Sequence, residues 1–150
     1  MVNLSWKKVL EQDLEYIGEE LREQLEGKTC IILTGEVGAG KTTFIQHFMK
    51  GFIEGDDEFL SPTYSLINEQ GCCAHADFYR IEDPEEIIHL EMGLYAEEKE
   101  YFLIEWGKPY LKEIRSQLGE QFSYYELIFE INSAESDSLM SRNIHLQKIT

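Results

Sequence analysis

The chain has 150 residues, of which 43% are hydrophobic and 28% are charged, a composition typical of one compact folded domain over residues 1–150. Its 29 Asp and Glu outnumber 13 Lys and Arg, and the formal net charge of −16 argues against direct binding of DNA or RNA phosphates. The three cysteines show neither zinc-ligand spacing nor a disulfide framework, and no apolar run approaches the ~20 residues of a membrane-spanning helix. We therefore expect a soluble cytoplasmic protein.

The first third of the chain predicts a helix, a buried strand and a second helix. Leucines recur at spacings of three and four between acidic residues, which predicts an amphipathic helix over Gln12–Leu25 that ends before Gly27. The continuous apolar run Cys30–Leu33 is typical of a strand buried on both faces. Apolar residues at helical spacing then extend from Phe44 to Phe52.

The rest of the chain mixes strands with a short helix. Pro84 suits the first turn of a helix because its missing N–H would be unpaired there. The predicted elements are a hairpin of 65–68 with 72–79 that turns at Gln70 and Gly71, the helix from Pro84 to Leu90, a buried strand over Tyr101–Ile104, and strands over Leu127–Ile131 and Asn143–Leu146 separated by a polar turn from Asn132 to Ser138. This alternation predicts an α/β sandwich with a mixed sheet.

A glycine-rich loop lies between the first predicted strand and the helix that follows it. The segment GEVGAGKT matches the G-x-x-x-x-G-K-[ST] pattern in full, and in this context its backbone N–H groups can surround a phosphate. Lys41 would reach the outer phosphates, and the Thr42 hydroxyl would ligate Mg²⁺. We predict a P-loop NTPase-like three-layer sandwich with a mostly parallel central sheet, whose nucleotide-binding residues are Gly35, Glu36, Val37, Gly38, Ala39, Gly40, Lys41, Thr42 and Thr43.

A magnesium nucleotide also requires a carboxylate at the end of a neighbouring strand. Glu105 closes the apolar run Tyr101–Ile104, and Asp77 lies at the far end of the segment that begins at Cys72. Their spacing in the sequence leaves their respective roles open. His75 and His47 show no matching set of metal ligands. The chain has no N-K-x-D guanine-reading motif, which favours ATP over GTP.

Two further residues have both a functional and an ordinary interpretation. Thr63, in the segment SPTY, could present its hydroxyl or carbonyl to the γ-phosphate and metal, or it could begin an ordinary extended segment. Arg80 could neutralise charge on the transferring phosphoryl group, or it could pair with a surface acid.

The motifs GEVGAGKTTF, SPTYSLI, HADFYR with DPEE shortly after, and IEW occur in this order, and the combination resembles the bacterial TsaE (YjeE) ATPases of tRNA threonylcarbamoyladenosine synthesis. The resemblance covers nearly the whole chain. It implies a magnesium-dependent ATPase that assists the TsaD and TsaB proteins, contacts tRNA only through that complex, and turns over slowly without them.

The resemblance also implies roles for individual residues. Lys41 would lie on the phosphates, Thr42 and Glu105 on Mg²⁺, and Thr63 in a switch loop; Asp77 would be the catalytic or water-orienting carboxylate, and Trp106 and Arg142 would lie close to the nucleotide. Two other functions stay open. One is a small-molecule or nucleotide kinase, for which 13 basic residues provide little material for an arginine-rich lid. The other is a module that binds ATP without hydrolysing it.

Overall fold

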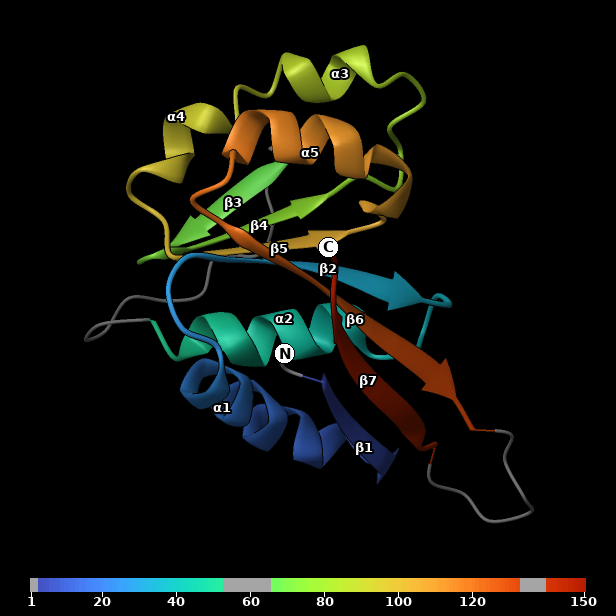
Figure 1. The fold of residues 1–150 in the computed structure, drawn as a ribbon. Coiled ribbons are helices and arrows are strands. Elements are labelled where there is room, and N and C mark those ends of the chain that lie inside the picture. The colour runs from blue at the N-terminus through green and yellow to red at the C-terminus, as the bar shows by residue number, and fades with distance from the viewer. Residues whose placement is uncertain (1–2, 53–65, 133–139) are drawn as a thin grey trace.

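The computed structural model describes residues 3–52, 66–132 and 140–150 (Figure 1). Thr63, with the rest of the SPTY segment, and nearly all of the polar turn predicted between Asn132 and Ser138 lie outside the described residues. The helices and strands follow in the order β1 (Asn3–Val9), η1 (Glu11–Asp13), α1 (Leu14–Gln24), β2 (Thr29–Gly35), α2 (Lys41–Lys50), β3 (Ile67–Gln70), β4 (Cys73–Asp77), α3 (Glu85–Ile88), α4 (Gly93–Ala96), β5 (Tyr101–Glu105), η2 (Lys108–Tyr110), α5 (Leu111–Leu118), β6 (Ser123–Ile131) and β7 (Arg142–Lys148).

Within these ranges the strands form one sheet in the order β1-β7-β6-β2-β5-β4-β3. The four central strands β6, β2, β5 and β4 are parallel neighbours. The outer strands β3, β7 and β1 each pair with their neighbours in antiparallel orientation. The prediction of an α/β fold with a mixed sheet and a parallel centre is thus confirmed.

Helices cover both faces of the sheet, so that the molecule has three layers (Figure 1). α1 and α2 lie against one face, and α3, α4 and α5 lie over the other. Successive residues of β2 alternate between the two layers: Ile31 and Leu33 belong to the core on the α1–α2 side, and Cys30 and Ile32 to the core on the α5 side. This alternation explains why β2 is a continuous apolar run, since a strand buried on both faces has no side that favours polar residues.

Several elements depart from the prediction: the short helices η1, α4 and η2 were not predicted, and Gln70, expected in the hairpin turn, is the last residue of β3 and pairs with Cys73. The edge strand β1 and the helix α5 were not predicted, and the helix after Pro84 ends at Ile88 rather than at Leu90. β1 carries Lys7 and Lys8, which weaken its apolar pattern, and it pairs only with β7. α5 buries a narrow stripe that includes Ile114 and Leu118. β1 buries only Val9, so its apolar pattern in the sequence is weak. α5 carries Leu111, Ile114 and Leu118 at helical spacing, so its sequence does hold an amphipathic signal that the prediction missed.

The parallel centre of the sheet determines where the functional side chains gather. Because β2, β4 and β5 point in the same direction, their carboxyl ends meet at one edge of the sheet. The register places Glu105 opposite Leu33 on one side and opposite Asp77 on the other. The glycine-rich loop leaves β2 at this same edge.

No helix in the described residues combines the length and apolarity that a membrane crossing requires.

Candidate nucleotide-binding site

The loop between β2 and α2 follows a path that requires glycine. Gly38 and Gly40 have φ values of +89° and +100°, a region that residues with a Cβ rarely adopt. Gly40 directly precedes α2, whose first residue is Lys41, and the Phe44 N–H returns to the Gly40 carbonyl at 2.8 Å. The loop therefore leads directly into the N-terminus of α2, where free N–H groups and the helix dipole favour binding of an anion.

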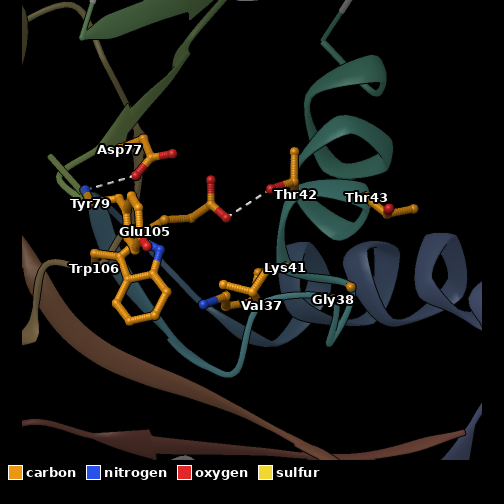
Figure 2. A pocket seen from close by; sticks show the side chains of 10 residues that line it. Val37, Gly38, Lys41, Thr42, Thr43, Asp77, Tyr79, Glu105 and Trp106 are labelled. Atoms are coloured by element: carbon orange, nitrogen blue, oxygen red, sulfur yellow. Dashed lines mark hydrogen bonds between the residues drawn. The ribbon is translucent and has the colours of Figure 1, made fainter.

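A pocket of about 460 Å³ opens over this loop (Figure 2). Its size lies within the usual range of a small-molecule site, which is roughly 300–1,000 Å³. All but one of its lining residues belong to the predicted site, and the exception is Tyr79. The lining residues are Val37, Gly38, Gly40, Lys41, Thr42, Thr43, Asp77, Tyr79, Glu105 and Trp106.

The carboxylate of Glu105 is held on both of its oxygens. Thr42 Oγ1 donates to Glu105 Oε1 at 2.9 Å (Figure 2), and His75 Nε2 lies 3.0 Å from Glu105 Oε2. Burial alone would raise the pKa of the Glu105 carboxyl, but the hydrogen bonds from His75 and Thr42 and the charge of Lys41 lower it below its ordinary value. Glu105 is therefore an ionised, fixed carboxylate at the end of β5.

Lys41 is almost completely buried within the loop. Its Nζ donates to the Gly35 carbonyl and lies 4.0 Å from the centroid of the Trp106 ring. Burial lowers the pKa of Lys41, although the nearby carboxylates of Glu105 and Asp77 act in the opposite direction. A cation in this position is only partly hydrated, so an anionic ligand in the pocket would gain a strong electrostatic partner.

Asp77 and Trp106 form the rim of the pocket opposite α2 (Figure 2). Asp77 is exposed, and its Oδ1 accepts the N–H of Tyr79 at 2.9 Å. The Tyr79 and Trp106 rings lie 5.1 Å apart between centroids, and Trp106 has a φ of +59°, which is uncommon for a residue other than glycine. The constrained backbone directly after Glu105 therefore holds Trp106 against Tyr79, which follows the end of β4.

Arg142 lies outside this pocket but beside the loop. It begins β7, is 2% exposed, and its guanidinium is 3.5 Å from the place where a Cβ on Gly40 would stand. Its Nε and Nη1 are buried and have no hydrogen-bond partner among the described residues. Arg142 also lines a second pocket of about 470 Å³, together with Leu10, Glu11, Gln12, His47 and Met140. Two buried guanidinium nitrogens without partners in the described part of the chain are costly unless a ligand supplies acceptors for them.

The oxygen ligands at this edge fit Mg²⁺ bound with a nucleotide. The described residues contain no group of three or more His, Cys, Asp or Glu side chains that could hold a metal ion by themselves. They do place the Thr42 hydroxyl against the ionised Glu105 carboxylate. Mg²⁺ is usually bound through one or two protein oxygens and substrate phosphates, and this pair corresponds to that donor set.

The structure adds two residues to those predicted. Tyr79 lines the pocket, and His75 contacts Glu105 although the sequence had indicated no ligand partner for it. The signal for His75 is its spacing of two from Asp77 within one strand, which places both side chains on the same face. Arg80 is exposed and does not line the pocket. Glu36 is exposed on the loop, whereas Ala39 is buried beneath it.

Comparisons with known proteins agree on one family. The sequence model of the family described as threonylcarbamoyl adenosine biosynthesis protein TsaE matches residues 9–142. Relatives named tRNA threonylcarbamoyladenosine biosynthesis protein TsaE are 35% identical in Aquifex aeolicus, over 60% of this chain and 71% of the relative, and 38% identical in Nostoc sp., over 63% of each. The Haemophilus influenzae relative is 34% identical over 59% of this chain and 58% of its own. The matched segments thus span less than two thirds of the Nostoc and Haemophilus proteins.

A solved structure supports the fold. The crystal structure of Bacillus subtilis YdiB superposes with a TM-score of 0.63 and covers 99% of this chain and 87% of that chain. The two sequences are 20% identical, so the likeness concerns the arrangement of strands and helices rather than individual site residues.

Proposed function

The chain belongs to the TsaE family, and on this premise we propose that it is a magnesium-dependent ATPase that assists the threonylcarbamoyladenosine modification of tRNA. The observation that carries the proposal is the hydrogen bond between Thr42, in the first turn of α2, and Glu105, at the end of β5, beside a complete phosphate loop. The predicted ligands of a magnesium nucleotide lie together only because α2 and β5 meet at this edge.

The phosphate tail of ATP would lie in the loop from Gly35 to Thr43, with Lys41 contacting the outer phosphates. Thr42 and Glu105 would hold Mg²⁺, which neutralises phosphate charge when it is bound. Asp77, exposed on the rim of the pocket, would orient the attacking water and accept its proton as the bond from the γ-phosphorus to the bridging oxygen breaks. The products are ADP and inorganic phosphate.

Arg142 would contact the nucleotide from the other side of the loop. Its guanidinium lies next to Gly40, and two of its nitrogens have no hydrogen-bond partner in the described part of the chain. The second pocket at Arg142 provides space of about 470 Å³ for the nucleoside end of ATP. Trp106 would lie beside the phosphates, because its ring already contacts the Lys41 ammonium.

The partners that we propose are the TsaD and TsaB proteins, with tRNA held by them rather than by this chain. A chain with a net charge of −16 offers few cations to an RNA backbone, which supports an indirect contact. The pocket is open and the proposed water-orienting carboxylate is exposed, so turnover in isolation should be slow until a partner closes the site. Thr63 stays a prediction for the switch that responds to ATP.

Phosphate release from ATP and Mg²⁺, measured with and without TsaB and TsaD, tests this proposal. We expect Lys41→Ala to lose most of its nucleotide affinity and Asp77→Asn to lose turnover while it still binds ATP. Lys112→Ala, at an exposed lysine of α5, is the matched control and should behave as the parent.

Three results would contradict particular parts of the proposal. Unchanged ATP binding by Lys41→Ala would remove the loop as the site. Equal turnover with and without partners would remove their stimulation. Transfer of the γ-phosphate to an added acceptor without free phosphate would identify a kinase instead.

A further inference from the structure

We propose that His75 is a positioning residue that holds the Glu105 carboxylate in the orientation required by the magnesium nucleotide. This inference rests on the proposed function. His75 lies in β4, two residues before Asp77, and its neighbour in the register of β5 is Leu103, two residues before Glu105. All four side chains therefore project from the same face of the sheet, toward α2.

The Glu105 carboxylate has a different hydrogen-bond partner on each oxygen. Oε1 accepts from Thr42 in α2 at 2.9 Å, and Oε2 lies 3.0 Å from His75 Nε2 in β4. An ionised carboxylate can only accept, so Nε2 of His75 carries the hydrogen in this contact. Rotation of the carboxylate about its last bond would weaken both hydrogen bonds, and the two partners together therefore define its plane.

His75 occupies a position that an apolar residue could fill. It is 8% exposed, its neighbours in β4, Ala74 and Ala76, are fully buried, and Cys73 on its own face is buried as well. A polar ring in such surroundings is favourable only when its polar atoms are satisfied. Glu105, which is 3% exposed, satisfies the ring at Nε2. Both side chains are buried, so the effect of the contact is to restrict rotation of the Glu105 carboxylate.

The expected consequence concerns the metal more than the nucleotide. His75 does not line the pocket and touches neither the loop nor Lys41 in any recorded hydrogen bond among the described residues. Removing its N–H should leave phosphate contacts intact while Glu105 gains rotational freedom. Partners that orient metal ligands typically change metal affinity about 10–100-fold when they are lost. We expect an effect of this size on Mg²⁺ and little effect on nucleotide binding in its absence.

The test compares His75→Leu, which lacks a donor, with His75→Gln, whose amide can still donate to Glu105. ADP affinity is measured by calorimetry in EDTA and in Mg²⁺, and Mn²⁺ affinity of the ADP complex by electron paramagnetic resonance. We expect His75→Leu to bind Mn²⁺ about 10-fold more weakly than the parent but to bind ADP in EDTA as tightly. His75→Gln should recover most of the lost Mn²⁺ affinity. His145→Leu, a matched change in β7 at the histidine that contacts Ser5, should leave all of these values unchanged.

A double-mutant cycle separates positioning from a general structural effect. In a Glu105→Gln background the His75→Leu change should cause no further loss in the Mg²⁺-dependent gain of ADP affinity, because the carboxylate it positions is absent. An equal loss in both backgrounds would overturn the proposal, as would unchanged Mn²⁺ affinity in His75→Leu. If the parent itself shows no Mg²⁺-dependent ADP binding, the proposed function fails rather than this inference alone.

A measurement on the unsubstituted protein covers the case in which His75→Leu does not fold. Imidazole ¹⁵N spectra should show Nε2 of His75 protonated, with a change in its shift when Mg²⁺ and ADP are added together. An Nε2 that carries no hydrogen would contradict the proposal. A ¹⁵N shift of His75 that stays the same when Mg²⁺ and ADP are added would contradict it as well.

Discussion

Thr42 Oγ1 and Glu105 Oε1 are 2.9 Å apart although 63 residues separate them in the sequence. The bond joins the first turn of α2 to the end of β5 and crosses the edge of the sheet at which the phosphate loop begins. It links Thr42, whose hydroxyl the phosphate-loop pattern predicted as a magnesium ligand, to Glu105, one of the two carboxylates whose roles their spacing in the sequence left open.

Replacing Thr42 tests the contact directly. Thr42→Val keeps the shape of the side chain and removes the hydroxyl, so Glu105 loses one donor and Mg²⁺ loses one ligand. A hydrogen bond to a charged group contributes about 1.5–3 kcal/mol, which corresponds to a loss of at least about 10-fold in Mg²⁺-dependent ADP affinity. Thr42→Ser should restore it. Calorimetry with and without Mg²⁺ measures the difference, and a Thr42→Val protein with the affinity of the parent would remove Thr42 from the metal site.

Trp106 should report on nucleotide binding through its fluorescence. Its ring lies 4.0 Å from the Lys41 ammonium, and an anion that attracts this ammonium will change the surroundings of the indole. In a Trp6→Phe background Trp106 is the sole tryptophan. We expect its emission to change as ATP is added. In the double variant Trp6→Phe, Lys41→Ala, ATP should leave the emission unchanged.

The Trp6→Phe background needs a control of its own. Trp6 Nε1 donates to Glu20 Oε2 at 2.8 Å, and loss of that bond costs about 1 kcal/mol, so its thermal unfolding is measured first. An emission spectrum that does not change when ATP is added in this background would place Trp106 away from the nucleotide.

Arg142 should show opposite effects on stability and binding. Its guanidinium is buried with two nitrogens that lack partners among the described residues, so Arg142→Met removes an unfavourable buried charge. Replacing buried ion pairs by apolar residues of similar volume is often neutral or stabilising by about 1–4 kcal/mol, and removing a buried cation with unpartnered nitrogens should act in the same direction. We expect a thermal midpoint equal to or above that of the parent and a weaker ATP affinity. Arg115→Met, at the arginine that stacks on Tyr124, is the control for charge removal. An Arg142→Met protein that binds ATP normally would contradict the nucleotide contact.

Glu126 should make stability depend on pH. Burial would raise the pKa of its carboxyl, but hydrogen bonds from Thr34, Gln147 and Lys108 and the charge of Lys108 lower it below its ordinary value of 4.5. A lowered pKa in the folded state stabilises the fold above the unfolded pKa, and this contribution is lost as the pH falls through the folded value. The thermal midpoint of the parent should therefore fall more steeply below about pH 4.5 than that of Glu126→Gln.

A control variant isolates that effect from the loss of any carboxylate. Glu130→Gln changes an exposed carboxylate on the same strand β6 and should keep the pH dependence of the parent. At neutral pH Glu126→Gln should be the less stable variant, because its amide carries no charge for Lys108. Parallel pH curves for the parent and Glu126→Gln would show that this carboxylate is not stabilised by folding.

Local features of the sequence predicted the phosphate loop. The pattern from Gly35 to Thr42 is contiguous, and its chemistry depends on backbone N–H groups and glycine conformations that short segments determine. The apolar run of β2 was equally readable, because a strand buried on both faces needs no partner to show its character. β1 was missed because it buries only Val9, whereas α5 was missed although Leu111, Ile114 and Leu118 stand at helical spacing.

The sequence by itself thus determined the kind of ligand, since an eight-letter motif specifies where a phosphate can approach the backbone. Only the tertiary structure decided that Glu105, and not Asp77, accepts the Thr42 hydroxyl, that His75 holds its other oxygen, and that Arg142 lies behind Gly40. These contacts join residues far apart in the chain, and they depend on strand order and register. Strand order depends on the packing of the whole sheet, and the local sequence around any one of these side chains does not determine it.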